Sequence, residues 1–288
     1  MKSEIAEAFL SLVKEKGMDK ADLTKIIEEI FLAMIKKKYG TTDNFNVFVN
    51  MEKGEIEITH SRTVVETVED ETSEIDLATA RLEEESFDVG DEYLEFIPIE
   101  SFGRRLIISA KQNLNQKIKE VEKEHIYEEF KNRVGEIVRG EIRQINRDQL
   151  FLSVDGNEVV LPKSEQIPNE RYRRGDSMRG IIKEVRQTAR LPEIVISRAD
   201  PLFLVRLFEL EVPEISDGII EIKGIAREPG ERTKIAVYSH DKRIDAVGAC
   251  VGMKGMRIQA IVKELNNEKI DIINWSSEPE IFITRALS

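Results

Sequence analysis

Two glycines near the end of the 288-residue sequence enclose a methionine and a lysine, in the order Gly252, Met253, Lys254, Gly255. Glycine has no side chain, so a sugar-phosphate backbone can lie directly against such a loop. Lys254 adds a positive charge, and backbone amides at the start of a following helix can face phosphate oxygens. The chemistry that these residues could do is therefore the binding of a nucleic-acid backbone.

The four-residue pattern alone is weak, because 16 glycines in 288 residues produce about one such spacing by chance. Its surroundings make it more specific. The segments on either side have helical apolar spacing, and the loop is preceded by two β-runs and followed by one. This order is typical of a KH domain of the second topological type, which clamps about four nucleotides. The expected helices are 201–210, 245–251 and 256–265, and the expected strands are 219–225, 234–238 and 270–273.

Arg257 and Ile258 follow the loop after Met256, and we expect both to contribute to RNA binding. Ile258 and Ile261 could line the floor of a groove for the bases, whose edges would be read by hydrogen bonds. The alternative is an ordinary turn between two helices without a ligand.

Five short β-runs precede this region and fit an OB-type barrel, a common binder of single-stranded nucleic acid. Turns are expected at Asp155-Gly156 and Gly175-Asp176. A purely structural barrel remains an alternative. The expected strands are 137–143, 149–154, 158–161, 178–185 and 194–197.

Basic and aromatic residues gather in the barrel sequence. Such a cluster combines phosphate neutralisation with rings on which bases can stack, although solvated loops often have the same composition. The candidate RNA-contacting residues are Arg171, Arg173, Arg174, Arg179, Tyr172 and Phe151.

The N-terminal part alternates between helical and strand patterns. Helical spacing predicts one helix through Ile5, Phe9, Leu12 and Val13, and a second from Leu23 to Ile35. A β-hairpin with a turn at Lys53-Gly54 should follow. A helix is then expected over 75–85, and a long connecting helix over 109–133.

Acidic residues are concentrated in the same part. Residues 1–133 carry 19 basic and 30 acidic residues, whereas 134–288 carry 24 and 25. Residues 66–100 hold fourteen acidic residues and one basic residue, Arg81. Such a surface repels nucleic acid and could bind a basic protein partner, although a solvated acidic face gives the same pattern.

Catalytic and metal-binding arrangements are not recognisable in the sequence. Cys250 has no second thiol, and the three histidines lack metal-ligand spacing. Glu83, Glu84 and Glu85 fit a charged helix face better than a nuclease metal site. We therefore expect a non-enzymatic protein without a cofactor or metal. No apolar run is long enough for a membrane span, and no signal peptide is recognisable, so we expect a cytoplasmic protein.

Three longer stretches resemble the NusA family. They read LFELEVPEISDGIIEIKGIAREPGERTKIAV over 207–237, VGACVGMKGMRIQAIVKEL over 247–265 and EKIDIINW over 268–275. The resemblance extends to the domain order and is strongest after Ser197. It implies a multidomain α+β chain with an N-terminal polymerase-binding domain and long connecting helix (1–133), an OB-type barrel of the ribosomal-protein S-one type (134–200) and a KH domain (201–288).

By this resemblance, the N-terminal domain would bind bacterial RNA polymerase beside its RNA exit channel, and the barrel and KH domain would contact single-stranded nascent RNA. The protein would regulate pausing, termination and antitermination together with other elongation factors. We expect a monomer.

The family usually carries a second KH domain directly downstream, whereas this sequence stops at Ser288. A shortened chain is the simplest explanation, and such a chain would bind RNA more weakly because it lacks the gain from linked sites.

Two alternatives use the same modules differently. An RNA-processing accessory of the polynucleotide-phosphorylase type also has KH and S-one modules, but there the KH domain precedes the barrel and both follow catalytic domains. A protein-interaction scaffold would have RNA modules without ligands.

Overall fold

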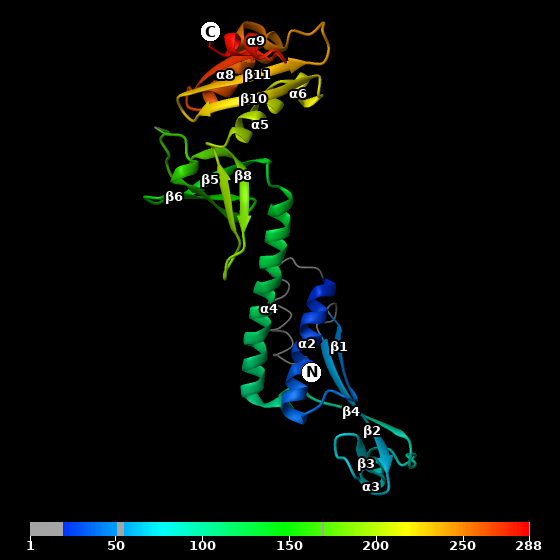
Figure 1. The fold of residues 1–288 in the computed structure, drawn as a ribbon. Helices are drawn as coiled ribbons and strands as arrows, with labels where there is room; N and C mark the ends of the chain where they lie inside the picture. Colours follow the sequence, from blue (N-terminus) through cyan, green and yellow to red (C-terminus); the bar gives the residue numbers. More distant parts are fainter. Residues whose placement is uncertain (1–19, 51–54, 169, 288) are drawn as a thin grey trace. The chain divides into compact units, whose positions relative to one another are not determined.

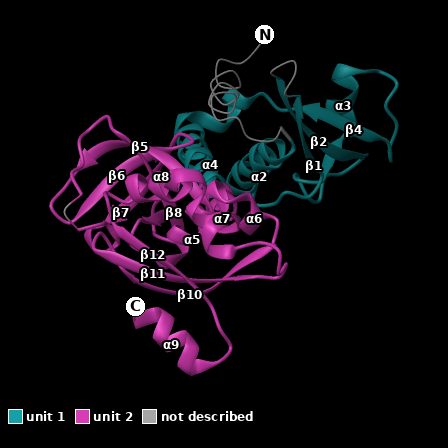
Figure 2. Cartoon of the chain, turned by 90° about the horizontal axis from the view of Figure 1, so that it is seen from above, with its two compact units in different colours: residues 1–122 teal, residues 123–288 magenta. Residues whose placement is uncertain are grey.

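The structure is a computed structural model that describes residues 20–50, 55–168 and 170–287. The chain divides into two compact units, Met1–Glu122 (unit 1) and Lys123–Ser288 (unit 2), shown in different colours in Figure 2. The predicted helix through Ile5, Phe9, Leu12 and Val13 and the predicted turn Lys53-Gly54 lie outside the described residues.

Two helices carry the main core of unit 1. Ile27, Phe31 and Ile35 lie at helical spacing on α2 (Lys20–Tyr39) and are completely buried, together with Leu114 of α4 (Gly103–Asn132). The predicted connecting helix is confirmed, but it begins at Gly103, after the short 3-10 turn η1 (Ile99–Phe102), and not at Ser109. Charged residues at 104 and 105 obscured its first turn in the sequence.

A small sheet completes unit 1. Strand β2 (Glu55–Val65) pairs antiparallel with β1 (Phe45–Asn50) and β4 (Glu92–Phe96), and parallel with β3 (Glu74–Asp76). The helix predicted from residue 75 begins later, as α3 (Leu77–Glu83), with Asp76 as its N-cap. Its first two expected residues pair with β2 instead, which places the Ile75 side chain in a core.

Unit 2 contains the predicted barrel. Five strands close in the order β5-β6-β7-β9-β8, and all five lie where the sequence predicted them, with ends shifted by up to two residues. Strands β5, β6 and β8 are labelled in Figure 1. Inward-facing Leu152, Val154, Ile182 and Ile196 form its core. The strands are β5 (Ile137–Ile145), β6 (Gln149–Val154), β7 (Asn157–Pro162), β8 (Ser177–Arg186) and β9 (Glu193–Ser197), with the 3-10 turn η2 (Lys163–Glu165) after β7.

The KH order predicted for the C-terminal part is also present. A three-stranded sheet, β10-β11-β12, has its first pair antiparallel and its second pair parallel. The last helix, α9 (Pro279–Leu287), was not predicted from the residue pattern. The elements are α5 (Pro201–Glu211), α6 (Pro213–Ser216), β10 (Ile220–Glu228), β11 (Arg232–Ser239), α7 (Ala246–Val251), η3 (Met253–Gly255), α8 (Met256–Glu264), β12 (Lys269–Asn274) and α9 (Pro279–Leu287).

None of the helices in the described ranges is long and apolar enough to cross a membrane.

Candidate nucleic-acid interface

The loop Gly252–Gly255 separates two helices, as the sequence argument requires. Helix α7 ends at Val251, a single 3-10 turn follows, and α8 begins at Met256. Lys254 has a φ of 54°, and the Gly255 amide donates to the carbonyl oxygen of Gly252 at 3.1 Å. The chain therefore turns sharply here and does not continue as one helix.

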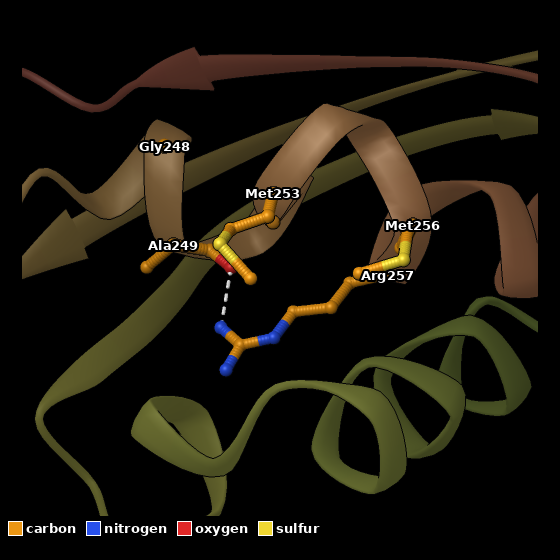
Figure 3. A pocket seen from close by; sticks show the side chains of 6 residues that line it. Gly248, Ala249, Met253, Met256 and Arg257 are labelled. Carbon is orange, nitrogen blue, oxygen red and sulfur yellow. Dashed lines mark hydrogen bonds between the residues drawn. The ribbon is translucent and has the colours of Figure 1, made fainter.

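The loop faces solvent. Met253 is 79% exposed and Lys254 is also exposed, and neither is covered by another described element. A pocket of about 310 Å³ lies beside the loop (Figure 3). Its lining combines small residues, which leave the backbone accessible, with two methionines and an arginine: Gly248, Ala249, Gly252, Met253, Met256 and Arg257.

The two glycines of the loop have different surroundings. Gly252 has φ 73° and ψ 172°, a conformation essentially restricted to glycine. A Cβ atom at Gly252 would lie only 2.8 Å from Cγ of Arg257. At Gly255 (φ 77°) the only neighbour of such an atom would be Ile258 at 3.9 Å, so the backbone of the second glycine is open to a ligand.

Arg257, Ile258 and Ile261, which follow the loop, are less exposed than Met253 and Lys254. Ile258 is half-buried against the core of the KH region, and Ile261 is completely inside that core, so Ile261 does not line a surface groove. Arg257 is only 32% exposed, and its guanidinium is bonded to Ala249 and Glu214. RNA contact by Arg257 and Ile258 stays a prediction.

The basic segment of the barrel, residues 171–174, leads into β8. Arg171, Arg173 and Arg174 are exposed. The Tyr172 ring packs against the barrel core, and its hydroxyl donates to Glu170 at 2.7 Å. Burial, followed by the nearby Glu170 carboxylate, raises the pKa of Tyr172. Only part of this ring is therefore accessible for stacking.

Phe151 and Arg179 lie on the strands themselves. Phe151 is half-buried on β6, opposite Gln144 of β5 and Val160 of β7. Arg179 on β8 lies with Nη1 3.9 Å from Oε2 of Glu264, at the end of α8. The candidate residues are thus spread over two strands and the segment before β8, where Arg171, Arg173 and Arg174 are exposed.

Arg198, which was not among the predicted site residues, joins the barrel to the KH region. Its side chain is 2% exposed, and it donates to both carboxylate oxygens of Glu170 at 2.9 and 2.7 Å. It also donates to the carbonyl oxygen of Arg179 at 2.6 Å and to Glu264. Arg198 therefore connects the residue preceding the basic segment to the helix that begins at the loop. An isolated arginine after a strand carries no sequence signal of this role.

A second buried ion pair holds the KH sheet. Arg227 of β10 and Glu268 before β12 are completely buried, 3.0 Å apart. Burial raises the pKa of Glu268, but hydrogen bonds from Arg227, Thr233 and the Gly230 amide outweigh it and lower the pKa below its usual value. Arg227 also donates to the carbonyl oxygen of Asp200, at the start of α5.

Cys250 and His60 are buried in packed cores, and His240 pairs with a carboxylate. Burial raises the pKa of the Cys250 thiol to about 12, so the reactive thiolate is disfavoured. The buried His60 ring stacks on Phe45 with centroids 3.9 Å apart. His240 lies 3.2 Å from Glu221 on the surface. Among the described residues, no group of three or more potential ligands could hold a metal ion.

Comparison with known proteins identifies two family regions. Residues 4–124 match the model of the NusA N-terminal domain, and residues 198–275 match that of the NusA-like first KH domain. A solved structure, the N-terminal domain of NusA from Bacillus subtilis, is 31% identical and covers 42% of this chain and 98% of its own, with a TM-score of 0.31.

Full-length relatives extend the match to the whole chain. The transcription termination/antitermination protein NusA of Bacillus subtilis is 40% identical over 288 residues, which are 100% of this chain and 78% of the relative. The protein of the same name from Thermus thermophilus is 40% identical over 300 residues, covering 100% of this chain and 77% of its own. This chain therefore belongs to the NusA family.

Proposed function

We propose that this chain is a non-enzymatic regulator of transcription elongation that binds bacterial RNA polymerase through unit 1 and single-stranded nascent RNA through unit 2. By holding both, it modulates pausing, termination and antitermination. The names of the relatives from Bacillus subtilis and Thermus thermophilus support the process. The proposal includes a monomeric cytoplasmic protein acting with other elongation factors, and three domains over 1–133, 134–200 and 201–288.

The observation that carries the RNA-binding part is the open backbone turn at Gly252–Gly255. Lys254 is exposed at its tip, and the first amides of the nine-residue helix α8 follow it directly. The Met256 amide already donates to the carbonyl oxygen of Met253, so a phosphate beside Gly255 can be bound by the next amides in the first turn of α8 and by the lysine ammonium together. Bases then extend from the loop along the half-buried Ile258.

The barrel supplies a second contact. Three exposed arginines, Arg171, Arg173 and Arg174, can neutralise phosphates without reading sequence. Because Arg198 joins Glu170 to Glu264, this basic segment and α8 have a fixed relation within unit 2. One RNA strand that binds both sites gains affinity from the second contact, because its translational and rotational entropy is lost only once.

Unit 1 supplies the protein contact. Residues 66–100 carry fourteen acidic residues, and most of the acidic side chains in this segment are exposed. An acidic surface of this kind repels RNA and attracts a basic surface on a protein partner. The two units therefore have charge properties that fit different partners.

A reconstitution experiment tests both parts. The 288-residue chain is mixed with purified bacterial RNA polymerase, with and without a nascent transcript, and complexes are separated by size-exclusion chromatography. We expect co-elution with polymerase in both cases, a cross-link to the transcript, and longer pauses at a hairpin. Lys254→Asp should keep the co-elution and lose most of the cross-link. A chain that neither co-elutes with polymerase nor changes pausing refutes the proposed function.

A further inference from the structure

One side chain joins three helices around the loop Gly252–Gly255. Arg257, in the first turn of α8, donates from Nη1 to the carbonyl oxygen of Ala249 on α7 at 2.7 Å, as Figure 3 shows. The same nitrogen donates to the carboxylate oxygens of Glu214 on α6 at 2.9 and 3.2 Å. A terminal guanidinium nitrogen has two hydrogens, and here one meets the carbonyl and the other the carboxylate.

The stem of the same side chain lies on the first glycine. Cγ, Cδ and Cβ of Arg257 would be 2.8, 3.0 and 3.1 Å from a Cβ atom at Gly252. These are the atoms nearest the backbone of α8, and the bonded guanidinium fixes the far end of the stem. A side chain at residue 252 would therefore displace Arg257 from its partners. The absence of a side chain at Gly252 is thus required by the arginine as well as by the backbone angles.

Arg257 is less available to a phosphate than Lys254. It is 32% exposed, and both hydrogens of Nη1 are already used. Lys254 differs, because it is exposed and no other described residue bonds to its ammonium. Nη2 and Nε of Arg257 bond to no other described residue, but the side chain is half-buried, so Lys254 is the more accessible cation at this loop.

We infer that Arg257 and Glu214 are positioning residues of the RNA-binding loop: together they hold the end of α7 and the start of α8 at the separation that exposes Lys254 beside the first turn of α8. The inference rests on the proposed RNA-binding function and assigns a role to Glu214 that its charge alone would not suggest. A carboxylate near an RNA site normally weakens binding, because it repels phosphate. As a positioning residue, Glu214 strengthens it.

Repulsion of phosphate and positioning of the loop predict opposite effects of removing the Glu214 charge on RNA affinity, and this difference provides the test. Glu214→Gln removes one negative charge and replaces a charged acceptor by a neutral one. Asp217→Asn makes the same charge change at an exposed carboxylate three residues further on. Binding of a fluorescent single-stranded RNA of about 12 nucleotides is measured by anisotropy at several salt concentrations. Loss of the charged acceptor should weaken RNA binding of Glu214→Gln roughly three- to tenfold, whereas Asp217→Asn should bind as the parent chain or more tightly.

A second variant separates positioning from direct contact. Arg257→Met keeps the stem over Gly252 and removes the guanidinium. If Arg257 contacts a phosphate, the slope of log affinity against log salt falls by about 0.7. If it positions the loop, affinity falls while the slope is unchanged. A smaller slope for Arg257→Met would overturn the inference for this residue.

The position of the loop can also be observed without RNA. In NMR spectra of the chain with carbon-13-labelled methionine methyl groups, the signals of Met253 and Met256 should shift in Glu214→Gln and in Arg257→Met. They should stay unchanged in Asp217→Asn. Thermal unfolding shows whether each variant remains folded.

Failure of the inference can be told apart from failure of the proposed function. A parent chain that binds no RNA, or a Lys254→Asp variant that binds equally well, removes the proposed RNA site and this inference with it. A parent chain that binds RNA through Lys254, combined with Glu214→Gln binding as tightly as Asp217→Asn and unshifted Met253 and Met256 signals, overturns the positioning role alone.

Discussion

Arg198 and Glu264 are joined by two hydrogen bonds across the boundary between the barrel and the KH region. Nη1 of Arg198 donates to Oε1 of Glu264 at 2.9 Å, and Nη2 donates to its backbone oxygen at 2.6 Å. Arg198 follows the last barrel strand, whereas Glu264 ends the helix that begins at the RNA-binding loop. The two modules of unit 2 are thereby connected through one buried guanidinium.

Replacing this guanidinium should destabilise unit 2. In Arg198→Met, Glu170 and Glu264 keep their charges in largely buried positions without their partner. Removing one partner of a buried ion pair costs on the order of 3 kcal/mol. Urea unfolding measures this as a lower midpoint. The control, Arg186→Met, breaks exposed ion pairs and should cost less than about 1 kcal/mol. Equal midpoints for the two variants would show that Arg198 does not hold the modules together.

The fold of unit 2 was largely predictable because its signals are local. Alternating apolar residues place each barrel strand, and helical spacing on both sides of Gly252 and Gly255 places α7 and α8.

In unit 1, a predicted helix boundary was wrong where tertiary contacts decide the local structure. Residue 75 has helical spacing with the residues after it, yet it pairs with Val64 in the sheet. Pairing with a distant strand is not encoded in neighbouring residues.

Acidification should destabilise unit 1 through His60. Burial and nearby Arg62 lower its pKa, and these effects exceed the opposing effect of its bond to the Thr72 carbonyl. The unfolded chain therefore binds a proton more readily than the folded one, and stability falls as pH drops below about 6.5. Thermal unfolding at pH 7.5, 6.5 and 5.5 measures this loss.

Two variants isolate the contribution of His60. His60→Gln should lose about 1 kcal/mol at pH 7.5, because its ring no longer stacks on Phe45, and should show a weaker pH dependence between 6.5 and 5.5. His125→Gln, at an exposed position on α4, should keep the pH dependence of stability of the parent chain. An unchanged pH dependence in His60→Gln would assign the acid sensitivity to other groups.

The basic segment of the barrel should add affinity without sequence preference. Arg173→Glu with Arg174→Glu removes two exposed cations and should weaken binding of every single-stranded RNA tested, with a salt slope smaller by about 1.4. Arg173→Lys with Arg174→Lys keeps both charges and should bind nearly as the parent chain. Anisotropy titrations with two unrelated RNA sequences measure the effect. Unchanged affinity in the glutamate variant removes this segment from the contact surface.

The acidic surface of unit 1 should contribute to polymerase binding. Glu71→Lys with Glu85→Lys reverses two exposed charges in the acidic segment and should weaken binding to purified polymerase severalfold, more at low salt than at high salt. Glu124→Lys with Glu158→Lys makes the same charge change in unit 2. Biolayer interferometry without RNA compares the two pairs. If both double variants have the same polymerase affinity, the acidic segment is only a solvated surface.

The candidate site was predictable in part. The residue types at 252–255 indicated backbone access, and the structure has an exposed turn there. The bonds of Arg257 to Glu214 and Ala249 could not be predicted, because they join residues 43 and 8 positions apart across three helices. Tyr172 likewise has the sequence context of a stacking residue, whereas its ring packs against the barrel core. A side chain's type indicates what it can bind, but tertiary contacts decide whether it is available.

RNA binding by Lys254→Asp, compared with Lys263→Asp, tests the central claim most directly. Both positions are exposed lysines, one at the loop and the other near the end of α8, and both substitutions change the charge equally. We expect Lys254→Asp to weaken binding of a single-stranded RNA by about tenfold or more, and Lys263→Asp to have a clearly smaller effect. Equal RNA affinities for the two variants would contradict a nucleic-acid site at Gly252–Gly255.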